Sequence, residues 1–151
     1  MTKIFITADQ HFYHGNIIKY CNRPFKTYQE MNEVMIKKWN DKVNVNDIVI
    51  HLGDFSLFGN EKAKEVRSKL NGTIILIRGN HDYKLTEDCG FIIVEGNLII
   101  GNNILSHKPL QEIPEGFVNV FGHIHHHKAY SGKCVCVEQT NYEPIELDNI
   151  I

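Results

Sequence analysis

The segment that decides the fold spans residues 48–82 and reads IVIHLGDFSLFGNEKAKEVRSKLNGTIILIRGNHD. Its two apolar runs, residues 48–52 and 73–77, are short and rich in β-branched side chains, which predicts buried strands. Between them, residues 60–70 have helical spacing and are followed by Asn71-Gly72, a common helix stop. A strand, a helix and a second strand of these lengths predict parallel pairing through a crossover connection.

The same pattern continues outward from this unit. Upstream lie an apolar run at residues 4–8 and a helical stretch, where Thr27 and Glu30 form a capping box ahead of Met31, Val34, Met35, Lys38 and Trp39. Downstream, the runs 91–94, 98–100, 104–105, 117–121 and 133–137 predict consecutive strands, with a Gly101-Asn102-Asn103 hairpin turn. We expect two packed sheets with helices outside, in a single domain over residues 1–151.

Composition is that of an ordinary globular chain. Of 151 residues, 42% are hydrophobic and 23% charged, and 16 Lys and Arg against 18 Asp and Glu leave a net charge of −2. This charge does not indicate binding to nucleic acid or to an anionic membrane. No apolar stretch approaches the length of a membrane span or a secretory signal, and the four cysteines form no C-x-x-C pair. We therefore expect a cytoplasmic protein with reduced thiols and no membrane contact.

Seven side chains of metal-binding types follow the predicted strands. They are Asp9, His11, Asp54, Asn80, His107, His123 and His125. Ligands at the ends of separate strands converge on one rim of a sheet. Carboxylate, imidazole and amide groups without thiolate favour Mn²⁺, Fe, Zn²⁺, Co²⁺ or Ni²⁺ over copper or Ca²⁺. Seven ligands exceed one tetrahedral site, so they predict two ions that share a carboxylate and attract a phosphate ester.

The ordered elements Asp9-x-His11, Gly53-Asp54, Gly79-Asn80-His81-Asp82, Ser106-His107 and Gly122-His123-x-His125 resemble the calcineurin-like metallophosphoesterase superfamily. The resemblance covers residues 4–126, and residues 9–25 are similar to a subgroup of small bacterial and phage phosphoesterases. It implies an α/β fold, a four-layer αββα sandwich of two mixed sheets flanked by helices. It also implies an enzyme that hydrolyses phosphoesters with two divalent metal ions, Mn²⁺ being our first choice.

The resemblance further implies a role for each residue. One metal would be held by Asp9, His11, Asp54 and His125, and the other by Asp54, Asn80, His107 and His123, so that Asp54 bridges them. A metal-bridging hydroxide would attack phosphorus in line. His81 would stabilise or protonate the departing oxygen, and Asp82 would orient His81 through a hydrogen bond.

Other candidates keep two interpretations. His14 and Asn16 could contact the substrate phosphate or cap a helix that begins near Gly15. Arg23 could neutralise a phosphate or lie exposed in a turn before Pro24. For four aromatic side chains, core packing is favoured over a stacking wall for a base: Phe12, Tyr13, Tyr20 and Phe25.

The expected substrate is a small phosphoester. A phosphodiester such as a cyclic nucleotide comes first, because a short chain has little material for a substrate-enclosing cap, and a phosphomonoester is the alternative. The rival function is a non-catalytic metal-binding or protein-interaction scaffold of the same fold. A metallo-β-lactamase-type hydrolase is disfavoured because its H-x-H-x-D-H motif is absent. His51, His126 and His127 are not assigned to the site: we expect His51 to pack within or beside the second strand and the other two to be solvated, with an adventitious nickel-binding tract at residues 125–127 as the alternative. The oligomeric state stays open.

Overall fold

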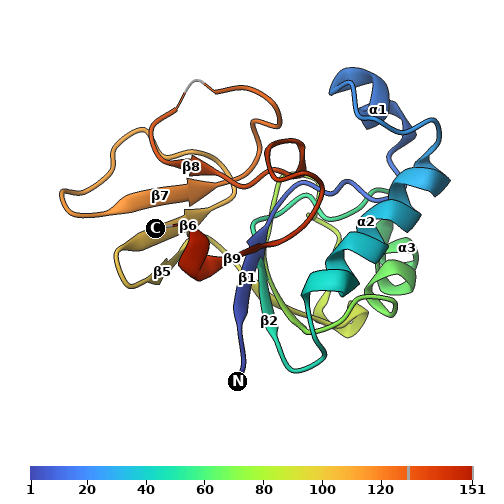
Figure 1. Ribbon diagram of the computed structural model, residues 1–151, viewed down its shortest axis with the longest axis horizontal. Coiled ribbons are helices and arrows are strands. Elements are labelled where there is room, and N and C mark those ends of the chain that lie inside the picture. The colour runs from blue at the N-terminus through green and yellow to red at the C-terminus, as the bar shows by residue number, and fades with distance from the viewer. Residues whose placement is uncertain (129, 151) are drawn as a thin grey trace.

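The computed structural model describes residues 1–128 and 130–150 and contains two β-sheets (Figure 1). The five-stranded sheet has the order β4-β3-β2-β1-β9 and consists of β1 (Ile4–Thr7), β2 (Ile48–His51), β3 (Thr73–Ile77), β4 (Phe91–Val94) and β9 (Ile145–Glu146). The four-stranded sheet has the order β5-β6-β7-β8 and consists of β5 (Leu98–Ile100), β6 (Asn103–Ser106), β7 (Val118–Phe121) and β8 (Lys133–Cys134). Antiparallel pairing joins β9 to β1 and β5 to β6, and the other pairs are parallel. Both sheets are therefore mixed, as predicted.

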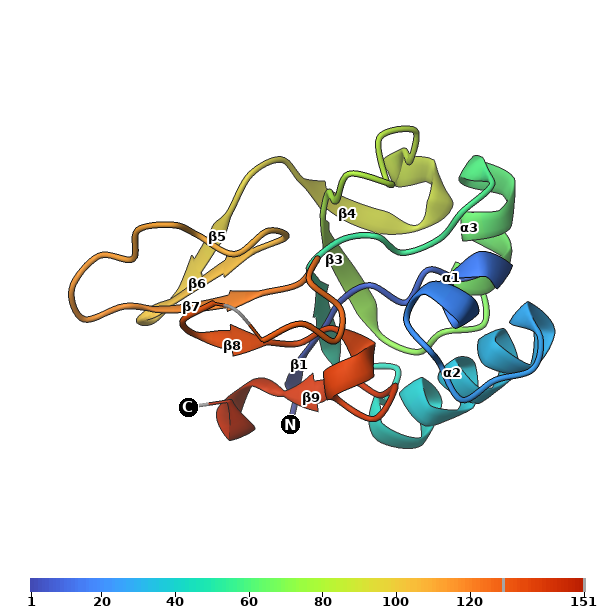
Figure 2. The same ribbon diagram turned by 90° about the horizontal axis from the view of Figure 1, so that it is seen from above.

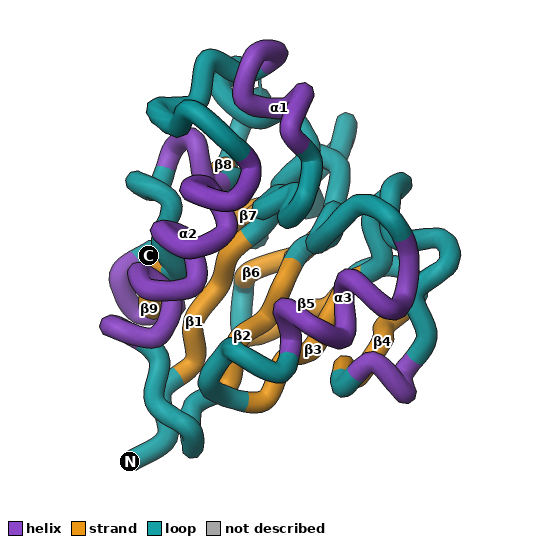
Figure 3. The backbone as a smooth tube through the Cα atoms, turned by 90° about the vertical axis from the view of Figure 1, so that its right-hand side faces the viewer, coloured by secondary structure: helices purple, strands orange, loops and turns teal. Residues whose placement is uncertain are grey.

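The helices flank these sheets. The described residues form α1 (Gly15–Tyr20), α2 (Tyr28–Lys42) and α3 (Gly59–Arg67), and three 3₁₀ helices, η1 (Glu87–Cys89), η2 (Val137–Gln139) and η3 (Leu147–Asn149). The α-helices lie on the side of the five-stranded sheet that faces away from the other sheet (Figure 2). Figure 3 shows α2 and α3 running across the face of that sheet. The predicted class, two mixed sheets with flanking helices, is confirmed, and the α-helices of the described residues all belong to one outer layer.

Two cores follow from alternation along the parallel strands. Phe5 and Val49 are buried against the helices, where Met31, Met35 and Trp39 of α2 pack. The neighbouring side chains on the same strands belong to the core between the two sheets, which contains Ile6, Ala8, Ile50, Leu52, Ile77, Leu105, Val120 and Val135. Since successive side chains of a strand point to opposite faces, both faces of the five-stranded sheet are covered.

Local signals account for most element boundaries. The Thr27 hydroxyl accepts a hydrogen bond from the amide of Glu30, so the predicted cap of α2 is present. Helix α3 ends at Arg67, three residues before the predicted end, because the amides of Lys69 and Leu70 bond to carbonyls three residues back. The Arg67 guanidinium then binds the carbonyls of Leu70 and Gly72.

Two strand predictions need correction. Asn103 pairs with Ile100 inside the hairpin, so the turn consists of Gly101 and Asn102, with Gly101 at φ +60°. Strand β8 ends at Cys134 rather than at residue 137, although Cys136 still makes an isolated bridge with Ala8. Strand β9, only two residues long, carries no sequence signal strong enough to predict it.

Parallel pairing brings the loops after β1, β2 and β3 to one edge of the five-stranded sheet. There the amide of Asp9 bonds to the carbonyl of Gly53 at 3.0 Å, and the amide of His11 bonds to the carbonyl of Asp54 at 3.1 Å. The loops after β6 and β7 reach the same edge, because the amide of His123 bonds to a carboxylate oxygen of Asp9 at 2.7 Å. The candidate ligands from both sheets therefore meet at one rim.

Candidate metal centre

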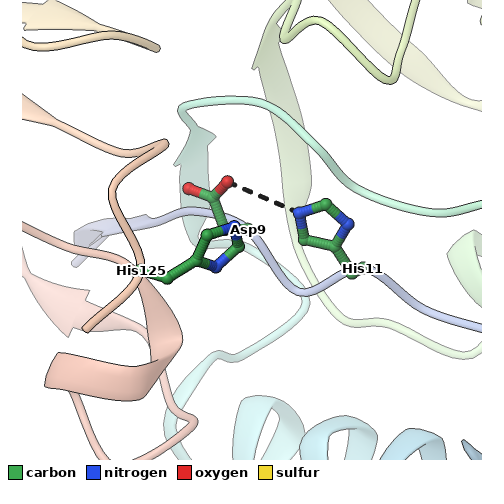
Figure 4. A group of neighbouring side chains, drawn as sticks. All are labelled: Asp9, His11 and His125. Carbon is green, nitrogen blue, oxygen red and sulfur yellow. Dashed lines mark ion pairs between the residues drawn. The ribbon is translucent and has the colours of Figure 1, made fainter. Parts of the chain in front are cut away.

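Of three groups of potential metal ligands among the described residues, the two that consist entirely of predicted ligands lie side by side at this rim. Asp9, His11 and His125 form one of them (Figure 4). Asp54, His107 and His123 form the other. The Oδ2 atom of Asp54 lies 3.5 Å from Nε2 of His11 and 3.5 Å from Nε2 of His107. The Asp54 carboxylate thus stands between the clusters, as a shared ligand would.

Two atoms of the first cluster are buried without a hydrogen-bond partner among the described residues: Oδ1 of Asp9 and Nε2 of His11, which are 3.6 Å apart. The other Asp9 oxygen is satisfied by the amide of His123 and, at 3.3 Å, by the thiol of Cys136. Buried polar atoms left unpaired are costly. A cation between them would satisfy both, so the residues fit a metal ion.

The second cluster is oriented by backbone and amide groups. The Nδ1 atom of His107 lies 2.7 Å from the carbonyl oxygen of Leu52, so this nitrogen carries a proton and Nε2 is the nitrogen that faces Asp54. Around Nε2 lie Oδ1 of Asn80 at 2.8 Å and Nδ1 of His123 at 3.2 Å. Burial opposes ionisation of Asp54, but without a metal Nε2 of His107 also binds a proton, and its hydrogen bond and positive charge hold the pKa of the Asp54 carboxyl well below the usual range. A divalent cation would displace that proton and leave an ionised carboxylate beside imidazole nitrogens, the donor set that it requires.

A carboxylate that the sequence analysis missed orients His125. Oε2 of Glu138, in η2, lies 3.1 Å from Nδ1 of His125 and 2.7 Å from the guanidinium of Arg23. Burial works against its charge, yet the bond to His125 and the charge of Arg23 hold the pKa of Glu138 at about 2. Burial likewise opposes protonation of His125, but Cys21 and Glu138 raise the pKa of His125 to about 10. Glu138 thus orients the ring through Nδ1, and a cation bound at Nε2 would displace the second proton of the imidazolium. No local motif marks it, because its partners lie far along the chain.

The position of Arg23 contradicts both interpretations drawn from the sequence, a phosphate contact and an exposed turn. Its side chain is neither exposed nor able to reach a phosphate, because its exposed fraction is 0%. The guanidinium donates to the backbone carbonyls of Asp9 and Gln10, each at 2.7 Å, and to Glu138. Arg23 therefore braces the loop that carries Asp9 and His11.

The backbone at the rim adopts a conformation that non-glycine residues avoid. Five of the seven candidate ligands have positive φ, between +52° and +72°: Asp9, His11, Asp54, His123 and His125. Such strain is concentrated at functional sites. The glycines of the motifs allow the loops to approach, since a Cβ on Gly53 would lie 2.7 Å from the Gly79 backbone and one on Gly122 would lie 2.5 Å from the Asp9 carboxylate.

Asp82 has a different role from the predicted one. Its carboxylate makes no hydrogen bond to the His81 ring within the described chain, and instead accepts from the amides of Asp54 at 2.6 Å, Gly79 at 2.7 Å and Phe55 at 2.9 Å. The side chain is fully buried, and burial raises the pKa of Asp82 in spite of these bonds. Asp82 therefore ties the loop of Asp54 to the loop of Asn80.

The remaining candidates lie at different distances from the centre. The His81 ring is exposed and stands 5.2 Å from the His11 ring, centroid to centroid, at the mouth of the site. The His14 ring is half-buried, with Nδ1 3.3 Å from Nδ1 of His11, and makes no helix-capping bond. Burial and the neighbouring His11 and His81 lower the pKa of His14 to about 4. Asn16 is exposed on α1 and lines a surface hollow with Lys19 and Lys26, away from both clusters.

The histidine and aromatic side chains that were not assigned to the site lie mostly where expected. His51 is buried in β2, where it accepts from the amide of Gly53 and donates to the Gln10 side chain. His126 and His127 are exposed and belong to neither cluster. Of the aromatics near the first motif, Phe12, Tyr13 and Phe25 pack on the helix core. Tyr20 does not, because it is 69% exposed and only its ring edge approaches His14.

Comparisons with known proteins agree with this fold. The calcineurin-like phosphoesterase family matches residues 2–150. The uncharacterized protein MJ1445 of Methanocaldococcus jannaschii is 42% identical over 164 residues, covering 100% of this chain and 90% of that protein. The crystal structure of AQ665 from Aquifex aeolicus, a protein of unknown function, is similar over 100% of both chains, with a TM-score of 0.78 and 25% identity.

A nuclease shares the fold at lower similarity. The Pseudomonas putida nuclease MPE matches with a TM-score of 0.55 and 22% identity, over 81% of this chain and 61% of that one. Within the described residues, no helix is long and apolar enough to cross a membrane. Since the family match spans nearly the whole sequence and is joined to clustered metal-type ligands, the chain belongs to the calcineurin-like phosphoesterase family.

Proposed function

We propose that this chain is a single-domain, dinuclear-metal-dependent phosphoesterase. The observation that carries the proposal is the position of Asp54, whose Oδ2 is 3.5 Å from the Nε2 atoms of both His11 and His107. A carboxylate between two ligand clusters is the arrangement that a two-metal phosphoester site requires. The unpaired buried atoms of Asp9 and His11 support it further.

Two divalent cations, when bound, would supply an acidified water as nucleophile and positive charge for the non-bridging phosphate oxygens. Mn²⁺ is our first choice on donor chemistry, with Fe, Zn²⁺, Ni²⁺ or Co²⁺ as alternatives. One ion would be held by Asp9, His11, Asp54 and His125, and the other by Asp54, Asn80, His107 and His123.

One residue of the chain, His81, is placed to protonate the leaving group. His81 lies at the solvent edge of the site, and its backbone amide is fixed by Oδ1 of Asp54 at 2.8 Å. Its imidazole can therefore donate a proton to the departing oxygen while its backbone stays tied to the bridging residue. His14 lies near the same opening, with its ring 6.5 Å from that of His81, and is a candidate contact for the phosphate.

We propose a small phosphoester as substrate, a phosphodiester such as a cyclic nucleotide first and a phosphomonoester second. Cytoplasmic action suits the four free cysteines. The test is a hydrolysis screen of bis(p-nitrophenyl) phosphate, p-nitrophenyl phosphate and cyclic nucleotides, with Mn²⁺ or with chelator. Hydrolysis should need the metal.

Asp54→Asn should abolish both hydrolysis and the second equivalent of bound Mn²⁺. Asp47→Asn is the matched control, because Asp47 is also a buried carboxylate that accepts backbone amides, from Lys3 and Asn44, outside both clusters. Hydrolysis that survives both chelation and Asp54→Asn would refute the proposal. Bound Mn²⁺ without hydrolysis of any ester would favour the non-catalytic scaffold.

A further inference from the structure

A pocket of about 470 Å³ opens next to the candidate metal centre. His81 lines it, together with Ser56, Phe58, Tyr83 and Lys84. Because the His81 ring also stands against His11, this one side chain separates the pocket from the metal ligands. A group attached to a phosphate at the centre would therefore extend into the pocket past His81.

The pocket displays two aromatic rings that the fold does not use. Phe58 is 69% exposed and Tyr83 is 70% exposed, so neither contributes to a core. Phe58 also has φ +72°, which is unusual for a bulky residue, and it makes no side-chain cap at the start of α3. A large apolar side chain that is both exposed and held in a strained conformation beside a candidate active site indicates recognition rather than packing.

Polar groups complete the pocket. Ser56 is only 5% exposed, and its hydroxyl oxygen is buried with no hydrogen-bond partner among the described residues. An unused buried hydroxyl is costly unless another polar atom satisfies it. The ammonium of Lys84 lies 5.5 Å from the centre of the Tyr83 ring, where it attracts the face of that ring and adds positive charge near the opening.

We propose that this pocket binds the nucleobase of a mononucleotide whose phosphate lies at the metal centre, an inference that rests on the proposed function and narrows its substrate class. Phe58 and Tyr83 offer the flat apolar faces on which bases stack. The Ser56 hydroxyl is buried in this structure, so it could bond to the polar edge of a base only after rotating toward the pocket. A pocket of about 470 Å³ lies in the range of small-molecule sites and is large enough for a nucleobase. The net charge of −2, without a basic tract, argues against a long polyanion.

The test measures binding without turnover. Isothermal titration of the Mn²⁺-loaded protein compares a phosphonate analogue of AMP, which cannot be hydrolysed, with the ribose phosphonate that lacks the base. We expect the base to strengthen binding by roughly tenfold or more, a difference of about 1.4 kcal/mol. Phe58→Ala and Tyr83→Ala should each remove most of that difference and leave the affinity for the ribose phosphonate unchanged. Both rings are exposed, so truncation spares the core.

The control is Tyr130→Ala, because Tyr130 is 47% exposed and lines a separate hollow that contains no candidate metal ligand. This variant should keep the wild-type preference for the base. Equal binding of the two phosphonates by the wild type would overturn the inference and leave the proposed hydrolysis standing. Tighter binding of a short thymidine oligonucleotide than of the AMP analogue would overturn the assignment to mononucleotides. Failure of both phosphonates to bind, together with no hydrolysis, would instead refute the proposed function.

Discussion

The Asp82→Asn substitution tests the role that the structure gives to Asp82. The carboxylate accepts three backbone amides, two at Oδ2 from Asp54 and Gly79, and one at Oδ1 from Phe55. An asparagine can keep the oxygen at only one of these positions. If it stays at the Oδ2 position, the new NH₂ group faces the amide of Phe55, and two buried donors are left without an acceptor.

The cost follows from these contacts. Hydrogen bonds to a charged group contribute roughly 1.5–3 kcal/mol, and an unsatisfied buried donor costs roughly 1–3 kcal/mol. Losing the charge at two bonds and the acceptor at a third should lower the free energy of unfolding by roughly 3–5 kcal/mol, from a total of about 5–15 kcal/mol for a domain. The midpoint of thermal unfolding should fall by roughly 6–20 °C.

Urea unfolding with chelator present measures the stability, and calorimetric titration measures the affinity for Mn²⁺. The affinity should also fall in Asp82→Asn, because Asp82 joins the loop of Asp54 to that of Asn80. The control Asp47→Asn disturbs two comparable bonds, from Lys3 and Asn44, so it should lose stability and keep its affinity for the metal. Wild-type stability of Asp82→Asn together with slow hydrolysis would refute this reasoning and return Asp82 to the role of orienting His81.

Three further predictions concern histidines and their partners. Glu138→Gln should weaken Mn²⁺ binding roughly 10- to 100-fold, because His125 loses the carboxylate at its Nδ1; an unchanged dissociation constant by calorimetry would contradict this. His81→Ala should lower kcat by roughly 10²- to 10⁴-fold and leave the metal content measured by atomic emission intact, since the ring is exposed and makes no hydrogen bond among the described residues. Burial lowers the pKa of His51 to about 3, so as the pH falls below about 6.5 the unfolded chain takes up the proton first. The chelated wild type should therefore lose stability between about pH 6.5 and pH 3, by up to about 1.4 kcal/mol per pH unit, and His51→Gln should show a shallower slope in urea unfolding across that range.

Local patterns predicted much of the fold. The runs at residues 73–77, 91–94 and 98–100 become β3, β4 and β5 with the expected bounds, because short β-branched segments between turns leave little alternative. The Thr27 cap was also predictable, because its hydrogen bond joins two residues only three positions apart in the chain. The placement of the ligand-type residues after strands was also predictable, since parallel strands must present their carboxyl ends at one edge.

The partners of those ligands were not predictable. Arg23 and Glu138 are 115 residues apart in the chain, and only the packing of η2 against the loop after β1 brings them together. From the sequence, Arg23 was assigned either to solvent or to a phosphate, since nothing nearby offered it a carboxylate. The resemblance to the family assigns Asp82 to its neighbour His81, whereas its hydrogen bonds cross to Asp54 and Phe55.

The amino-acid order by itself determined which chemical groups stand at the ends of the strands, and therefore the kind of centre that this protein can build. The tertiary structure alone decided how those groups are held: Asp54 between two clusters, His125 on Glu138, and Phe58 and Tyr83 around a pocket beside His81. The reason is physical. Secondary structure follows from neighbours along the chain, but the orientation of a ligand depends on hydrogen bonds between segments whose separation is set only when the two sheets pack.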